Sequence, residues 1–145
     1  MTRVERSAII AHPAARLYRL VAEVERYPEF LPWCSRATET AESEDLTRAT
    51  LEIDFHGIRQ SFTTRNLHRR DESIVLTLVD GPFRRLDGHW TFRPLGPDAC
   101  KVEFVLAWEF RSTLLERLVG PAFGRIANSI FEAFVRRADQ PAEPA

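Results

Sequence analysis

The longest hydrophobic pattern lies in the last third of the chain, where a pair of apolar residues recurs at every fourth position from residue 114 to 135. This spacing is typical of an amphipathic helix. Because four residues exceed one turn, the apolar side drifts by about 40° per repeat, which requires a broken helix or a curved partner. Gly120 and Pro121 offer a break, since proline interrupts helical hydrogen bonding and suits a first turn. The pattern predicts a short helix at 112–119 and a longer one at 122–138.

The first forty residues predict one strand followed by two small helices. An apolar run at 4–10 is typical of a strand. After Pro13, leucine and valine recur at helical spacing and predict a helix at about 13–24. A single turn is expected at 27–30, and Pro28 and Pro32 prevent either helix from extending.

From Ser35 the hydrophobic period changes to two and stays there for most of the middle of the chain. Strands are predicted at 46–55, 58–68, 73–79, 86–93 and 100–110, with glycine- and proline-rich turns between them. The segment 73–79 is nearly all apolar, as expected of a strand at the centre of a sheet. Together with the first strand and one near residue 35, this gives a meander of about seven antiparallel strands.

This order of elements predicts an α+β fold in which a curved antiparallel sheet wraps around the long C-terminal helix. Each strand has one apolar face, and the only sizeable element able to cover that face is this helix. A space between the sheet and the helix is a natural site for an apolar ligand. We expect a single domain at 1–139 and, because 140–145 holds two prolines without periodicity, a disordered tail there.

Composition narrows the classes of partner. Among 145 residues, 21 acidic side chains nearly balance 20 basic ones, for a formal net charge of −1, so DNA is not an expected partner. No apolar run approaches the roughly 18 residues that span a bilayer, and we expect a cytoplasmic protein. Cys34 and Cys100 lie far apart without metal-ligand spacing, which predicts buried free thiols and no metal site.

The sequence offers no recognisable catalytic constellation. We find no paired inward carboxylates and no histidine beside a nucleophile. The four histidines, His12, His56, His68 and His89, fall in turns, at strand ends or on the predicted outer face. The expectation is therefore a non-enzymatic protein without a cofactor.

Four segments carry a resemblance to a known family. They are Tyr27-Pro28-Glu29-Phe30-Leu31-Pro32-Trp33-Cys34, Asp80-Gly81-Pro82-Phe83, Gly88-His89-Trp90-Thr91-Phe92 and Cys100-Lys101-Val102. In this respect the chain resembles the coenzyme Q-binding and ribosome-association-toxin (RatA-like) family, over about residues 3–138. That family belongs to the START-like polyketide cyclase/dehydrase superfamily, which implies the helix-grip fold. The resemblance implies either ubiquinone binding in support of respiration or a toxin that blocks the joining of ribosomal subunits, and one fold carries both roles.

The candidate ligand-binding residues are those expected between the sheet and the helix. They are Leu31, Trp33, Phe55, Phe62, Thr64, Asn66, Phe83, Trp90, Phe104, Trp108, Phe123 and Ile130. Their rings and apolar walls suit a quinone head group and an isoprenoid tail, although an ordinary aromatic core explains them equally well. Polar residues on the inward face, Gln60, Thr64 and Asn66, need partners if buried. A quinone oxygen could accept a hydrogen bond from Gln60 or Asn66, and the alternatives are cross-strand pairing or a buried water.

Two surface features bear on partners. The segment 27–32 is expected to cap the cavity, either as a structural plug or as a gate that touches a membrane, in which case the protein would lie peripherally at the inner membrane. Arginines 59, 65, 69 and 70, with 84 and 85 near another turn, form either a basic patch for a ribosomal subunit or a solvated face. The leading hypothesis is a lipid chaperone that binds ubiquinone or another isoprenoid quinone. The alternative is a toxin on the large ribosomal subunit, and a polyketide cyclase/aromatase is the least favoured.

Overall fold

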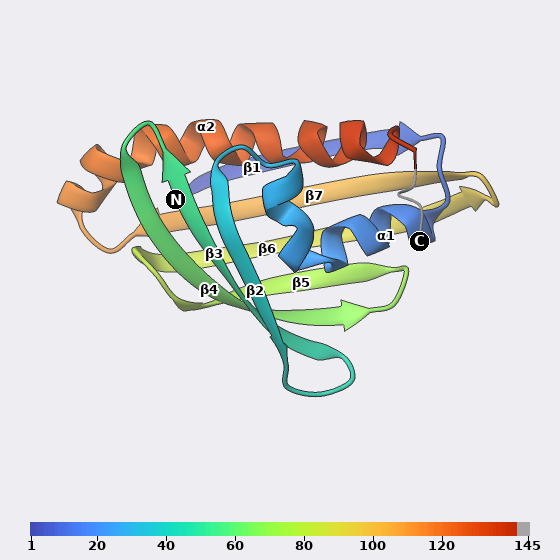
Figure 1. Cartoon of the computed structure of the whole chain (residues 1–145), viewed down its shortest axis with the longest axis horizontal. Coiled ribbons are helices and arrows are strands. Elements are labelled where there is room, and N and C mark those ends of the chain that lie inside the picture. Colours follow the sequence, from blue (N-terminus) through green and yellow to red (C-terminus); the bar gives the residue numbers. More distant parts are fainter. Residues whose placement is uncertain (142–145) are drawn as a thin grey trace.

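The computed structural model describes residues 1–141 and has the predicted α+β architecture (Figure 1). The elements in chain order are β1 (Thr2–Ile10), α1 (Ala14–Ala22), the 3-10 helix η1 (Val24–Glu29), β2 (Cys34–Ala41), β3 (Leu46–Phe55), β4 (Ile58–Arg69), β5 (Ser73–Asp80), β6 (Phe83–Gly96), β7 (Ala99–Phe110) and α2 (Thr113–Ala138). α1 forms within the predicted range 13–24. η1 begins at Val24, three residues before the single turn predicted at 27–30. No helix among the described residues is long and apolar enough to cross a membrane.

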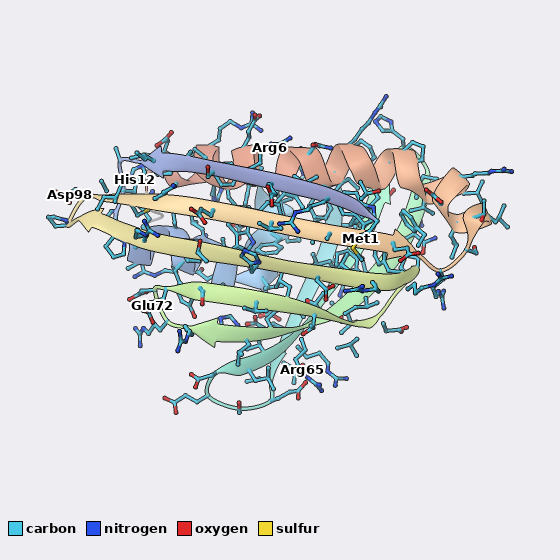
Figure 2. All side chains as sticks on the ribbon, turned by 180° about the vertical axis from the view of Figure 1, so that it is seen from behind. Met1, Arg6, His12, Arg65, Glu72 and Asp98 are labelled. Carbon is cyan, nitrogen blue, oxygen red and sulfur yellow. The ribbon has the colours of Figure 1, made fainter. Side chains whose placement is uncertain are left out.

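The strands form one antiparallel sheet in the order β1-β7-β6-β5-β4-β3-β2, which places β5 at the centre as predicted. The sheet curves around α2, and α1 and η1 lie on the same concave side (Figure 1). The convex side is open and carries charged side chains (Figure 2). Only one face of β5 is therefore buried: Ile74 is inaccessible, whereas Val75 and Val79 point outward and are exposed.

α2 is one continuous helix, so the prediction of two helices separated at Gly120-Pro121 is wrong. Ser112 caps its start by accepting a hydrogen bond from the Leu115 amide at 3.1 Å. Pro121 lies inside the helix and bends it, since proline lacks the amide that would bond the preceding turn. The helix continues because Val119 and Phe123, on either side of the bend, are both buried in the same core.

The first turns of α2 also differ from the prediction that their apolar pairs face the sheet. Leu114 is 66% exposed and Leu118 is 59% exposed. These turns extend toward the end of the sheet and are set at an angle to the rest of the helix (Figure 1), so only part of their apolar surface is covered. Because the apolar side rotates along the helix, these two leucines face solvent and not the sheet.

The chain end of the described region is fastened to α1. The Arg16 guanidinium donates to the Ala138 carbonyl at 2.6 and 2.9 Å and to the Gln140 carbonyl. The Gln140 amide also bonds the Arg137 carbonyl at 3.1 Å. Gln140 and Pro141, which the sequence assigns to the tail, are thus placed against the domain, and the remainder of the predicted tail, 142–145, lies outside the described residues.

Candidate functional site

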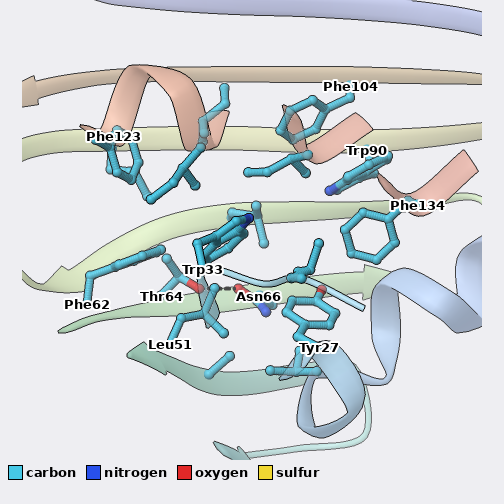
Figure 3. Close-up of a pocket in the computed structure, with 18 residues that line it drawn as sticks. Tyr27, Trp33, Leu51, Phe62, Thr64, Asn66, Trp90, Phe104, Phe123 and Phe134 are labelled. Carbon is cyan, nitrogen blue, oxygen red and sulfur yellow. Dashed lines mark hydrogen bonds between the residues drawn. The ribbon is translucent and has the colours of Figure 1, made fainter. Parts of the chain in front are cut away.

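A cavity lies between the concave face of the sheet and α2, and η1 with the segment after it closes one end (Figure 3). Its lining residues are Val24, Tyr27, Leu31, Trp33, Ala49, Leu51, Phe62, Thr64, Asn66, Leu76, Leu86, Trp90, Phe104, Leu106, Phe123, Ile126, Ile130 and Phe134. The atom-free space, including solvent at the mouth, is about 690 Å³, of which about 80 Å³ can hold the centres of water molecules. A single water needs roughly 10–15 Å³ by the latter measure, so the space is larger than a single-water void.

Nine of the twelve candidate residues line this cavity. They are Leu31, Trp33, Phe62, Thr64, Asn66, Trp90, Phe104, Phe123 and Ile130. The other three, Phe55, Phe83 and Trp108, do not. The rings of Phe83 and Trp108 pack on Phe123 at centroid distances of 4.9 and 5.0 Å, which makes them the core behind the cavity wall. Phe55 packs instead on the ring of His56, at the tip of the β3–β4 hairpin.

Some lining residues were not predicted from the sequence. Leu51, Leu86 and Leu106 lie on the inward strand faces that alternation identifies, so that signal could have included them. Tyr27 and Phe134 come from separate helical segments, and their rings approach to 5.3 Å only in the folded chain. Nothing in the local sequence marks that pair.

The aromatic wall of the cavity is built around Trp90. Its ring lies 4.4 Å from Phe104 and 5.1 Å from Phe134 by centroid. Strand alternation places Trp90 and Phe104 as directly opposed residues on β6 and β7, with both side chains facing α2. Tilted and edge-on ring pairs of this kind fix side chains in place, so this wall is preorganised.

The polar part of the cavity wall is Thr64 and Asn66, two positions apart on β4 and therefore on the same face (Figure 3). Asn66 is 4% exposed and Thr64 is 6% exposed. The Thr64 hydroxyl donates to Asn66 Oδ1 at 2.7 Å. No residue in the described range 1–141 accepts a hydrogen bond from Asn66 Nδ2. The pair therefore presents an unused amide donor among apolar walls.

Gln60 lies on the same strand face but does not line the cavity. It belongs to a separate polar groove near the start of β4, which also contains Arg59, Asp80 and Arg111. Two residues of strand rise separate successive inward side chains by about 7 Å, so Gln60 sits beyond Phe62 at the cavity edge. Of the polar residues proposed for a ligand, only Thr64 and Asn66 line the cavity.

The segment 27–32 forms part of the cavity cap. The Tyr27 hydroxyl donates to the Val21 carbonyl, and burial raises the pKa of this phenol. Leu31 is buried, and Pro32, next to it, is exposed. On the outside of the cap, the Phe30 ring lies edge-on to Phe134 at 5.1 Å. The cap is therefore a thin aromatic layer between the cavity and the surface.

Two titratable groups beside the cavity were missed by the sequence. Glu39 lies on the concave side of β2, opposite buried Ala49, and no partner for its buried Oε2 is found within residues 1–141. Burial raises the pKa of this carboxyl. His68 is half-buried and bonds Tyr18 at 3.0 Å and Thr47 at 2.9 Å. Both groups line a groove under α1 and not the cavity, because β4 and β2 continue past the cap.

The two cysteines are buried free thiols, as predicted. Burial raises the pKa of Cys34 to about 11, so this group stays a protonated thiol at neutral pH.

The predicted basic patch does not form as one surface. Arg59 and Arg69 are ten strand residues apart, or about 34 Å along β4. Four of the six arginines lie within 4 Å of a carboxylate: Arg59 with Asp54, Arg65 with Glu42, Arg84 with Glu109 and Arg85 with Asp87. Arg69 and Arg70 are exposed beside the β4–β5 turn.

Comparison with known proteins identifies the family. Residues 10–135 match the family model described as polyketide cyclase / dehydrase and lipid transport. The chain belongs to this family. It is 43% identical over 139 residues to the ribosome association toxin RatA of Pseudomonas aeruginosa, with 96% of each chain covered. It is 27% identical over 136 residues to the mitochondrial coenzyme Q-binding protein COQ10 homolog B of Xenopus laevis, covering 91% of this chain and 56% of that protein.

Solved structures show the same fold. The Zhui aromatase/cyclase from Streptomyces sp. R1128 superimposes with a TM-score of 0.81 at 16% identity, covering 95% of this chain and 93% of that one. These comparisons confirm the resemblance to the coenzyme Q-binding and RatA-like family and the START-like helix-grip fold. They do not identify the ligand or the partner of this chain.

Proposed function

We propose that the protein binds a hydrophobic isoprenoid ligand, with ubiquinone or a similar quinone as the best fit, and carries it as a lipid chaperone for respiration. The observation that carries the proposal is the unused Asn66 amide donor in an otherwise apolar cavity. A hydrogen bond from this amide to a ligand oxygen would contribute about 0.5–1.5 kcal/mol. A quinone carbonyl supplies the missing acceptor without bringing charge into the cavity.

The cavity walls suit the rest of such a ligand. Trp33 and Trp90 offer ring faces and edges to a planar head group. The cavity is too small to enclose both a head group and a long isoprenoid tail. The tail would therefore leave the cavity past Leu51, Phe62 and Ile130, which line it and are partly exposed. Each methylene buried there would add roughly 0.8 kcal/mol. Several isoprene units would then give tight binding.

We propose a binding role and not catalysis. Within the described cavity lining there is no aspartate, glutamate, histidine or lysine to act as a general acid or base. One structural neighbour is named an aromatase/cyclase. A cyclase acting on a polyketide would need such a group near the substrate.

The experiment that tests the proposal is organic extraction of the natively purified protein, followed by mass spectrometry. A heat-denatured, washed sample and an unrelated protein serve as controls. A quinone at near one equivalent supports the proposal and names the ligand. No quinone after extraction, together with no binding of added ubiquinone in detergent, contradicts it.

A second proposal is association with the large ribosomal subunit. It is supported by the relative named ribosome association toxin, which is 43% identical over nearly the whole chain. The contact surface would be the β4–β5 turn, where Arg69 and Arg70 are exposed. Co-sedimentation with isolated large subunits should then be lost in the Arg69→Glu/Arg70→Glu variant and kept in an Arg84→Glu control. Binding that is insensitive to salt and to the double substitution would rule out this surface.

A further inference from the structure

A second concave site lies outside the cap, between α1, η1 and the end of α2. Four arginines line it, Arg16, Arg19, Arg26 and Arg137, together with the apolar side chains of Leu20 and Phe30. We call it the arginine groove. Its volume, measured as space for the centres of water molecules, is about 380 Å³. The sequence does not predict it, because its arginines come from three separate elements.

Within residues 1–141, the arginines that line this groove outnumber the carboxylates that contact them. Glu29 bonds both Arg26, at 3.2 Å, and Arg137, at 2.7 Å. Glu23 is the second carboxylate, 3.5 Å from Arg26. Among residues 1–141, the carboxylates within 4 Å of these arginines are those of Glu23 and Glu29.

Arg19 is the arginine most available to a ligand. It is exposed, and no ion pair or hydrogen bond joins its side chain to another residue in the range 1–141. The guanidinium of Arg16, by contrast, already donates to carbonyls at the end of α2. A guanidinium that has no partner among these residues and lies at the edge of an arginine-lined groove is suited to bidentate contact with a phosphate.

The groove is one aromatic ring away from the cavity. The Arg137 guanidinium lies 5.1 Å above the Phe30 ring on the groove side. On its other sides the same ring contacts Tyr27 at 6.2 Å and Phe134 at 5.1 Å, and both of those residues line the cavity. Charged and apolar surfaces thus meet at Phe30.

We propose that the arginine groove binds the phosphate head group of an anionic phospholipid, which docks the capped end of the cavity against a bilayer. The mixture of arginine with leucine and phenylalanine matches a molecule that has both a phosphate and an apolar part. The interleaved carboxylates, Glu23 and Glu29, make a long nucleic-acid backbone a poorer fit. The inference goes beyond the proposed function, because head-group binding does not depend on which ligand fills the cavity.

The test is sedimentation of the full-length protein with vesicles of phosphatidylcholine containing 30 or 0 mole per cent phosphatidylglycerol, in low salt. We expect binding to the anionic vesicles only. Arg19→Glu changes the groove by two charge units and should weaken binding roughly 30-fold, and Arg19→Ala should weaken it roughly 5-fold. Arg125→Glu is the matched control, since Arg125 is an exposed arginine on α2 outside the groove, and should stay within about twofold.

Several results would overturn the proposal. They are equal binding to neutral vesicles, no binding to anionic vesicles, and equal losses in Arg19→Glu and Arg125→Glu with both variants folded by circular dichroism. Release from vesicles by a few millimolar inorganic phosphate would assign the groove to free phosphate instead. Binding of poly(U) that is tighter than vesicle binding and lost in Arg19→Glu would assign it to RNA. Quinone extraction detects only a ligand in the cavity, whereas vesicle sedimentation detects binding by the arginine groove. The two experiments can therefore fail independently.

Discussion

Removing the polar pair from the cavity is the sharpest test of how a quinone would be recognised. The single substitution Asn66→Leu deletes the amide donor but also leaves the Thr64 hydroxyl without its acceptor at 2.7 Å. Thr64 is buried, so this loss alone would cost about 1–3 kcal/mol of stability and would confuse the result. The double substitution Thr64→Val/Asn66→Leu removes both partners and keeps similar volumes, and its effect on stability should be close to neutral.

The expected effect on binding follows from the hydrogen bond that the double variant cannot make. A quinone carbonyl left without a donor in an apolar cavity loses about 1–3 kcal/mol, which is a rise in Kd of roughly 5- to 150-fold. Trp33 and Trp90 line the cavity, so quenching of tryptophan fluorescence by a short-tailed ubiquinone measures this Kd directly. Urea unfolding of the same samples verifies that the variant is folded.

The chain offers a matched control on the opposite face of the sheet, at Thr50 of β3 and Thr63 of β4. Thr50 and Thr63 share a hydrogen bond of 2.7 Å between their hydroxyls, away from the cavity. Thr50→Val/Thr63→Val should therefore leave the Kd within about twofold. If the cavity variant is folded and binds quinone as tightly as the wild type, Asn66 is not a ligand contact and the reasoning from its unused donor is wrong.

Three further predictions concern stability. Phe123→Ala should lower the free energy of unfolding by about 3–5 kcal/mol, because Phe123 is buried under several rings. Leu118 is exposed, so Leu118→Ala should change this free energy by under about 0.5 kcal/mol. Similar losses for the two variants in urea titrations would contradict this packing. Gly81→Ala should destabilise the protein more than Gly57→Ala. Both glycines have positive φ, but a Cβ at Gly81 would lie 2.7 Å from the Phe62 Cβ, whereas a Cβ at Gly57 would meet open space. Equal melting temperatures of the two variants would be inconsistent with this clash. Burial raises the pKa of Glu39, so the folded protein binds this proton more tightly than the unfolded chain and loses stability as pH rises above the ordinary value near 4.5. Glu39→Gln should accordingly raise the melting temperature at pH 7 but not at pH 4, and a gain of the same size at both values would exclude this linkage.

Much of the fold could be predicted because it depends on local periodicity. Alternation along β3 and β4 correctly assigns the inward faces, including the position of Asn66. Turn residues such as Gly57 and Gly81 mark the ends of strands because they adopt positive φ. The failure at Pro121 has a tertiary cause. Local rules favour a break there, and packing on both sides of the proline keeps the helix continuous.

The candidate site was predictable only where strand faces define it. Trp90, Phe104 and Thr64 line the cavity because alternation fixes their direction, and Phe55 was wrongly included because alternation does not tell where along a strand the cavity ends. The burial of His68 could not be predicted because α1, whose Tyr18 contacts it, is distant in sequence.

The sequence by itself determined the order of elements, the inward face of most strands and the family, since these depend on residue periodicity and on short segments, such as 27–34, that resemble the family. Only the tertiary structure decided that the amide of Asn66 is left unused, that Glu39 Oε2 is buried without a partner among residues 1–141, and that four arginines from three elements share one groove. The physical reason is that hydrogen bonding, desolvation and charge are set by distances across the fold. Residues far apart along the chain come together only when the sheet curves around α2 and the cap closes over its end.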